Sequence, residues 1–311
     1  MITFIGDKSR SSGQVRGIQV AQAMSRRRTH HPRTGFAMTG NFFDVSSNSF
    51  IGHSGFHKTV IFVRSFHPQL ALQLKNGGHK LGFDIIDRAV ANLHGLQKND
   101  QSITEIDWSV LTHGLIDFYV VTNQRSKKRL SQCVDSHCVH VIPHHAAPDS
   151  LVEKEDKLPC VVGYIGLPDQ LHHAQEIKSH VESLGLEFFT GHPLNREECC
   201  DMLSKIDIGV IFLERNNRTG YVLDYKPNQK LSNFQCFGIP TVACDYDSFK
   251  EFGGDAYVVV KTLEEVLRAI TMLVENKDTR ADIRKRGYTA GKALLSTNVA
   301  CYYERMLDEI E

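Results

Sequence analysis

The chain has 311 residues, with 36 Lys and Arg against 36 Asp and Glu, and 41% of its residues are hydrophobic. This length favours two domains, the hydrophobic fraction excludes a wholly disordered chain, and the zero net charge gives no support to a nucleic-acid partner. No apolar run reaches the roughly 20 residues that a membrane-spanning helix needs. The N-terminal residues lack the basic and apolar regions of a signal peptide, and the 8 cysteines form no compact framework, so we expect a cytoplasmic protein with reduced thiols.

The first half of the chain alternates short apolar runs with longer amphipathic segments. The apolar runs predict strands at Met1–Ile5, Thr59–Val63, Lys80–Ile86, Phe118–Thr122 and Val139–Ile142. The amphipathic segments predict helices at Gly17–Arg27, Pro68–Leu74, Ala89–His94, Ile106–Leu111 and Ser126–Gln132.

A polar stretch from Ala146 to Leu158 interrupts this pattern and is typical of an interdomain linker. The alternation then restarts. Further strands are expected at Cys160–Ile165, Glu187–Thr190, Ile208–Leu213, Thr241–Cys244 and Tyr257–Val260. Further helices are expected at Gln170–Leu184, Glu197–Ser204, Gln229–Phe237, Leu263–Glu275 and from Thr279 to the end. The pattern therefore predicts an α/β protein with two parallel-sheet domains, whose ligand site lies in a cleft between them.

The segment from Tyr225 to Ala243 carries the strongest functional signal. Pro227 presets the first turn of a helix, Asn228 can cap its free N–H groups, and Gly238 can end it. A helix N-terminus that also carries two lysines, Lys226 and Lys230, is suited to bind a diphosphate. The alternative interpretation is an ordinary connection from a helix through Gly and Pro to a strand.

This segment resembles the donor-binding segment of glycosyltransferases with the GT-B fold, through Lys226-x-x-x-Lys230-Leu231, a helix, and Gly-Ile-Pro-Thr-Val-Ala. Other segments are similar to the family in the same order. They are ITFIGDKSRSSGQVRGIQVAQAM near the N-terminus, VHVIPHH before the linker, CVVGYIG after it, MLSKIDIGVIFL, and the closing helices. The resemblance implies two Rossmann-like domains that face a cleft.

The resemblance also implies a role for each part of the chain. Residues 1–148 would bind the acceptor, 149–158 would link the domains, 159–290 would bind a nucleotide sugar, and 291–311 would form a helix that packs back on the first domain. The implied activity is transfer of a sugar from a nucleotide sugar to a glycan, a lipid-linked acceptor or another hydroxyl acceptor, without a cofactor or an essential metal. The alternatives are a nucleotide-sugar 2-epimerase of the same fold and a non-catalytic nucleotide-sugar-binding scaffold subunit.

The family motif predicts the donor-binding residues. They are Gly191, His192, Tyr225, Lys226, Asn228, Lys230, Leu231 and Asn233. The chain departs from the family at two of these positions, because many retaining members carry glutamates where Tyr225 and Asn233 stand. Asn233 can still bond a ribose hydroxyl, but Tyr225 cannot replace a carboxylate that binds the sugar. The donor sugar and the stereochemical outcome therefore stay open.

The first domain offers candidates for the acceptor side. Gly13 and Arg16 lie in a small-residue loop after the first strand, where the backbone can approach a ligand and Arg16 supplies charge. His67 and Asp87 are the candidate catalytic residues, and Asp84 lies close to Asp87 at the carboxyl end of a predicted strand. The alternatives are a tight strand–helix turn for the loop, a cap or turn role for His67, and pairing or helix capping for Asp87.

Several remaining features have ordinary explanations. We regard the triplet Asp245-Tyr246-Asp247 as coincidental, and the spacing of Cys133, Cys138, His140 and His144 does not match a standard zinc site. The basic clusters Arg26–Arg28 and Lys127–Arg129 are either solvated faces or contacts to an anionic membrane on its inner, cytoplasmic face.

Overall fold

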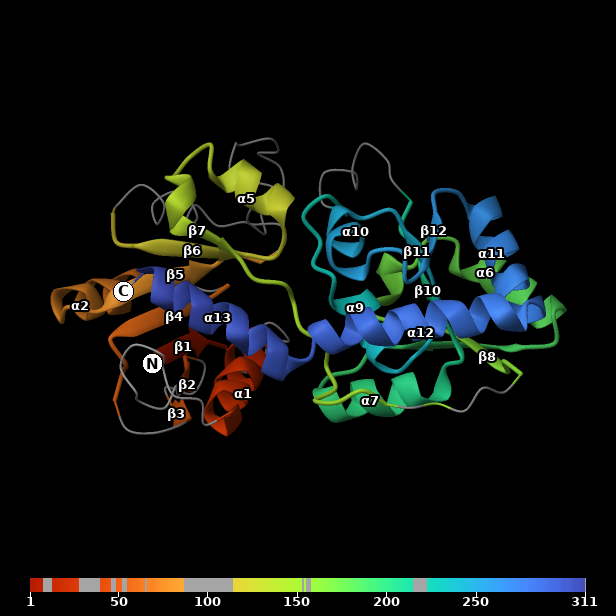
Figure 1. Ribbon diagram of the computed structural model, residues 1–311, viewed down its shortest axis with the longest axis horizontal. Helices are drawn as coiled ribbons and strands as arrows, with labels where there is room; N and C mark the ends of the chain where they lie inside the picture. The colour runs from red at the N-terminus through yellow and green to blue at the C-terminus, as the bar shows by residue number, and fades with distance from the viewer. Residues whose placement is uncertain are drawn as a thin grey trace. The chain divides into compact units, whose positions relative to one another are not determined.

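The structure is a computed structural model that describes residues 1–7, 13–27, 40–45, 49–51, 55–64, 66–86, 114–152, 154, 158–214 and 223–310. The chain divides into two compact units (Figure 1). Met1–His144 and Ser296–Glu311 form the first unit, and His145–Leu295 form the second. The C-terminal helix therefore belongs to the same unit as the N-terminal strand.

The first unit is built on a sheet with the strand order β3-β2-β1-β4-β5-β6-β7, in which only the pair β2–β3 is antiparallel. The strands are β1 (Ile2–Gly6), β2 (Gly40–Asp44), β3 (Ser49–Ile51), β4 (Thr59–Val63), β5 (Lys80–Asp84), β6 (Phe118–Val121) and β7 (Val139–Val141). The residues of β1, β4 and β6 are all buried. Their continuous apolar runs are typical of parallel strands that are covered on both faces.

The helical elements of the first unit are η1, a π-helical segment (Gly13–Gln19), α1 (Val20–Arg27), α2 (Pro68–Asn76), α5 (Gln124–Leu130), the 3₁₀ turn η2 (Ser136–Cys138) and α13 (Ser296–Ile310). Pro68 takes the first position of α2, where its missing N–H costs no helical bond. Asn123 caps α5 by accepting a bond from the Ser126 amide at 2.7 Å.

Helix α13 packs its apolar face against α1 and β1. Val299, Tyr303 and Leu307 are fully buried on this face. The ring of Tyr303 meets Phe4 of β1 edge to face, with centroids 5.3 Å apart. The C-terminal residues thus complete the core of the first unit.

The second unit is built on a fully parallel sheet with the strand order β12-β11-β10-β8-β9. The strands are β8 (Val161–Ile165), β9 (Glu187–Gly191), β10 (Ile208–Ile211), β11 (Thr241–Cys244) and β12 (Val258–Val260). The surrounding helices are η3, a 3₁₀ turn (Pro168–Gln170), α6 (Ala174–Ser183), α7 (Arg196–Lys205), α9 (Gln229–Cys236), α10 (Asp247–Gly253), α11 (Leu263–Glu275) and α12 (Lys277–Ala293).

Helix α9 is held on two sides. A Cβ at Gly209 of β10 would lie 2.9 Å from the Phe234 ring, and a Cβ at Gly291 of α12 would lie 2.9 Å from the Cys236 amide nitrogen. Gly238 follows the helix in the left-handed conformation (φ +57°), which ends α9 where the sequence predicts. These close contacts fix where the first turn of α9 points.

The predicted fold class, two parallel-sheet α/β domains, is confirmed. The predicted helix Gln170–Leu184 is too long, because His173 adopts a left-handed conformation (φ 56°) and α6 begins only at Ala174. Strands β2 and β3 and helix α10 were not predicted. The helices predicted at Ala89–His94 and Ile106–Leu111 lie outside the described residues.

Over the ranges that the structure describes, no helix is both long enough and apolar enough to cross a membrane.

Candidate functional site

The second sheet changes its winding direction at β8. The chain passes from β8 to β9 on one side and then to β10 on the other side. Open α/β sheets bind ligands beyond the carboxyl ends of their strands at such a reversal. The candidate site of this unit is therefore formed by the segments that follow β8 and β10, together with the start of α9.

Two lysines at the start of α9 converge on the segment after β8. Lys230 Nζ donates to Tyr164 Oη at 2.6 Å and to Gln170 Oε1 at 3.2 Å, and Lys226 Nζ donates to the same Gln170 oxygen at 3.1 Å. Lys230 Nζ also lies 4.6 Å from the centroid of the Tyr164 ring. Tyr164 and Gln170 thus position the two ammonium groups.

Tyr164 stays protonated in this arrangement. Burial raises the pKa of its hydroxyl, and Asp169 adds to the shift. The hydroxyl donates to the Leu167 carbonyl at 3.0 Å while it accepts from Lys230. The phenol is therefore a fixed support for the lysine.

Gly166 brings the backbone against this lysine. It has a φ of +151°, and a Cβ at this position would lie 2.7 Å from Lys230 Nζ and 2.5 Å from Tyr164 Oη. Because Gly166 has no side chain, the loop after β8 can approach the ammonium group of Lys230 closely. The sequence analysis did not single out this glycine.

The predicted cap of α9 is wrong. Asn228 occupies the N-cap position in a helical conformation, but its side chain makes no capping bond. Its amide donates instead to Ser232 Oγ at 2.6 Å, and Ser232 Oγ donates to the Asn228 carbonyl at 3.0 Å. Asn228 therefore stabilises the first turn through a buried side-chain pair.

The structure places Asn233 against the chain's own backbone. Its Oδ1 accepts a bond from the Ala147 amide at 2.7 Å, and the residue is only 8% exposed. Leu231 is buried in the core of the second unit, whereas Tyr225 is partly exposed. Asn233 and Leu231 thus fix the position of α9 within the second unit.

Gly191 and His192 lie where β9 ends. The Gly191 carbonyl accepts a bond from the Gly166 amide at 2.8 Å, so the ends of β8 and β9 are tied together. A Cβ at Gly191 would lie 2.6 Å from Met202 Sδ, which explains the glycine by packing. His192 is exposed beside it.

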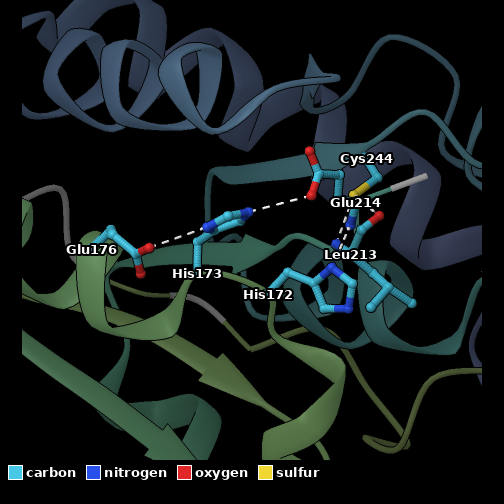
Figure 2. A network of polar contacts seen from close by, with 6 residues as sticks. All are labelled: His172, His173, Glu176, Leu213, Glu214 and Cys244. Atoms are coloured by element: carbon cyan, nitrogen blue, oxygen red, sulfur yellow. Dashed lines mark hydrogen bonds and ion pairs between the residues drawn. The ribbon is translucent and has the colours of Figure 1, made fainter. Parts of the chain in front are cut away.

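A histidine–glutamate network lies where β8 and β10 lead into their loops (Figure 2). His173 Nδ1 lies 3.2 Å from Glu176 Oε1, and His173 Nε2 lies 3.4 Å from Glu214 Oε2. The neighbouring His172 Nδ1 accepts from the Glu214 amide at 3.2 Å. The adjacent histidines are visible in the sequence, but their link to Glu214 is not, because Glu214 lies 41 positions beyond His173.

The structure does not support Arg16 as a ligand residue. Its guanidinium is fully buried and donates to both carboxylate oxygens of Asp84, at 2.8 and 3.0 Å, and to the carbonyls of Ile142 and Pro143. Tyr303 Oη also donates to Asp84, at 3.1 Å. Arg16 therefore stabilises the interior of the first unit, since its donors serve this network.

The other candidates of the first unit are placed only in part. His67 precedes α2 in an extended conformation, and its side chain makes no capping bond. Gly13 is the first residue of η1. Asp87 lies outside the described residues.

The buried thiols are not reactive groups. Burial raises the pKa of Cys199 to about 12, that of Cys236 to about 12 and that of Cys244 to about 11. They stay protonated and behave as small hydrophobes. Cys160, in contrast, is exposed.

Within the described ranges, no group of three or more His, Cys, Asp and Glu side chains has an arrangement that could hold a metal ion. Asp245 of the Asp-x-Asp triplet pairs with Lys250 at 2.6 Å.

No family model matches the chain, and no curated protein matches it in sequence. Solved structures match it over much or nearly all of its length. HepE from Anabaena, solved with UDP and glucose, is 11% identical with a TM-score of 0.63, and the match covers 99% of this chain and 98% of that one. Sucrose-phosphate synthase from Thermosynechococcus elongatus is 10% identical with a TM-score of 0.60, over 99% of this chain and 98% of that one.

The match to the pneumococcal O-GlcNAc transferase GtfA, in complex with UDP and GlcNAc, is 14% identical with a TM-score of 0.54 and covers 81% of this chain. The chain spans 56% of that transferase and 57% of the matching chain in the GtfA/B complex. At these identities the likeness concerns the fold. The two parallel-sheet units and these matches together show that the chain has the GT-B glycosyltransferase fold.

Proposed function

We propose that this protein is a glycosyltransferase whose second unit binds a nucleotide sugar and whose first unit binds a hydroxyl acceptor. The observation that carries the proposal is the pair Lys226 and Lys230, held by Gln170 and Tyr164 beyond the end of β8. Two positioned ammonium groups beside the start of a helix suit a diphosphate. HepE and GtfA, which share the fold, were solved with UDP bound.

The proposed chemistry is stabilisation of a leaving nucleoside diphosphate. When the bond between the sugar and the diphosphate breaks, negative charge develops on the diphosphate oxygens. Lys226 and Lys230 would stabilise that charge more strongly in the transition state than in the ground state, which is what accelerates the step. We propose that the lysines supply this charge without an essential metal, so that activity persists in EDTA.

The first unit supplies the acceptor side in this proposal. Asp87 and His67 remain the candidate residues for accepting the proton of the acceptor hydroxyl. A glycan or lipid-linked acceptor, a cytoplasmic location and a peripheral contact to anionic lipid through Arg26–Arg28 and Lys127–Arg129 are parts of the same proposal.

Replacement of Lys230 tests the donor site. Lys230→Met keeps the length of the side chain and removes its charge. We expect the Kd of the nucleoside diphosphate that binds the wild type to rise at least about tenfold, because hydrogen bonds to charged groups contribute about 1.5–3 kcal/mol. Isothermal titration calorimetry with UDP, GDP and ADP measures this change.

The matched control is Lys178→Met. Lys178 lies on α6 of the same unit and pairs with Glu182 across one turn, at 3.7 Å, so its loss should leave nucleotide binding unchanged. Equal affinities for wild type and Lys230→Met would remove the donor-site assignment. So would the absence of binding by all three nucleotides.

A non-catalytic nucleotide-sugar-binding subunit is the second candidate. It is favoured by the engagement of Asn233 with the Ala147 amide, at a position where the family's charged residue is missing. Binding of a nucleotide sugar without hydrolysis, and without transfer to a range of acceptors, would support this second function over the first.

A further inference from the structure

We propose that Glu214 and His173 form a hydroxyl-recognition pair that selects the sugar of the donor, beside the lysines that bind its diphosphate. This inference rests on the proposed function, because it concerns the other half of the same ligand. It assigns the substrate-specificity role to residues outside the donor motif.

The backbone around this pair is fixed by bonds between the loops after β8 and β10 (Figure 2). The Glu214 amide donates to His172 Nδ1 at 3.2 Å. The His172 amide in turn donates to the Phe212 carbonyl at 2.9 Å. The Leu213 amide donates to Cys244 Sγ at 3.0 Å. These three hydrogen bonds therefore fix the backbone position of Glu214 without a ligand.

The side chains of the pair are accessible as well as fixed. The Glu214 side chain is 51% exposed and that of His173 is 32% exposed, and the two are in contact at 3.4 Å. The hydrogen bond to Glu176 raises the pKa of His173, and the hydrogen bond to Glu214 adds to that shift. The imidazole lies between the carboxylates of Glu176 and Glu214, and these contacts orient Glu214.

This combination suits neighbouring hydroxyl groups. An ionised carboxylate has two acceptor oxygens, and it can accept bonds from two adjacent hydroxyls of a sugar ring. The imidazole, whose two nitrogens face Glu176 and Glu214, holds this carboxylate in place. A phosphate, in contrast, would be repelled by the two carboxylates beside His173, so this pair is complementary to the polyol part of a ligand.

The pair lies close to the lysine pair along the chain. Gln170, whose Oε1 accepts from both lysines, precedes His173 by three residues. Three residues span at most about 11 Å. The loop after β8 therefore carries both the contact to the two lysines and one member of the Glu214–His173 pair. This arrangement, at the reversal point of one sheet, suits a ligand in which a diphosphate is bonded directly to a sugar.

The backbone of His173 supports this assignment. It is one of the two described residues other than glycine with a positive φ. L residues adopt this conformation at an energetic cost, and such strain is typical of positions whose geometry serves a ligand. The left-handed turn directs the imidazole toward Glu214, as Figure 2 shows.

The experiment compares nucleoside diphosphates with nucleotide sugars. Calorimetry on the full chain uses UDP, GDP and ADP, and the glucose, mannose and N-acetylglucosamine conjugates of the nucleotide that binds. We expect one conjugate to bind the wild type more tightly than the free nucleoside diphosphate. That conjugate and its nucleoside diphosphate are then titrated against each variant.

Glu214→Gln removes the charge at constant shape. It should raise the Kd of the nucleotide sugar at least tenfold and change the Kd of the free nucleoside diphosphate less than twofold. Glu214→Asp should retain part of the selectivity. His173→Asn should shift the same ratio in the same direction, since asparagine tolerates the left-handed backbone.

The matched control is Glu182→Gln, an exposed glutamate on α6 whose partner is Lys178; it should change neither Kd. If Glu214→Gln weakened the binding of the nucleotide sugar and of the nucleoside diphosphate equally, or weakened neither, the proposed hydroxyl recognition would be wrong. A panel in which no conjugate binds more tightly than its nucleoside diphosphate would overturn it as well. A Lys230→Met variant with unchanged nucleotide binding would instead refute the proposed function, so the two failures are distinguishable.

Discussion

Each unit places basic side chains beside the carboxyl end of a parallel strand, but the burial of these side chains differs between the units. In the first unit, Arg16 is fully buried and paired with Asp84, which is also fully buried. In the second unit, Lys226 and Lys230 are partly exposed and bond the neutral groups of Gln170 and Tyr164. A strand end with a basic residue is therefore not by itself a binding site.

The difference follows from desolvation. A charge taken fully out of water needs an ionised partner, and Asp84 meets that need for Arg16. A lysine that stays at the surface keeps much of its hydration and can exchange it for a phosphate oxygen. The degree of burial thus distinguishes the structural role of Arg16 from the surface position of the two lysines.

The largest effect should come from breaking the buried pair. Asp84→Asn leaves Arg16 buried without an ionised partner, so we expect the free energy of unfolding of the first unit to fall by about 3–5 kcal/mol. Differential scanning calorimetry of the full chain measures the loss. Glu182→Gln, which breaks an exposed pair, should cost about 0–1 kcal/mol. An Asp84→Asn variant no less stable than this control would contradict the structural role of the pair.

Gly166→Ala should have a smaller effect, and this effect should be on nucleotide binding. The added methyl would lie 2.7 Å from Lys230 Nζ, so the ammonium group must move away from the loop. We expect the Kd of the nucleoside diphosphate to rise about tenfold, equivalent to about 1.4 kcal/mol, in the same calorimetric titration.

Gly185→Ala separates the effect on the lysine from backbone strain. Gly185 also has a positive φ (+74°), but a Cβ there would meet no atom within 4 Å. The control should lose stability for the same backbone reason and keep its nucleotide affinity. If both variants bind the nucleotide like the wild type, Gly166 does not support the donor site.

The smallest effect should be the pH dependence of stability from His173. Its pKa is raised in the folded state by Glu176 first and by Glu214 second, so its contribution is fully present below the pKa of an unfolded histidine, about 6.5. The contribution disappears as the pH rises through the raised pKa. The melting temperature of the wild type relative to His173→Asn should therefore fall over this window. A difference that is constant with pH would show that the contacts of His173 with the two glutamates do not depend on its charge.

Local sequence patterns were sufficient for most of the secondary structure. Strand Thr241–Cys244 and helix Leu263–Glu275 have the bounds that their apolar residues predict. The hydrophobic pattern of a buried strand or an amphipathic helix depends only on the residues within that element. Strands β2 and β3 escaped prediction because their short segments contain polar residues such as Asn41 and Ser49. Helix α6 was extended too far because a helical pattern does not show that His173 is left-handed.

The residues of the candidate site also include some that local sequence predicted and some that it did not. The motif around Lys226 and Lys230 marked the candidate donor segment in the sequence. The same reasoning assigned Asn233 to a ligand, but its carboxamide bonds the Ala147 amide, 86 positions away in the chain. The partner of such a group is decided by which segment packs against it.

The amino-acid sequence by itself determined the two parallel-sheet domains, the limits of many strands and helices, and the lysine motif at the start of α9, because these depend on residues close together in the chain. Only the tertiary structure decided that Arg16 is buried against Asp84, that Gly166 makes room for Lys230, and that His173 meets Glu214. Each of these depends on desolvation and packing between segments that are distant in the chain, and residue type alone does not specify either one.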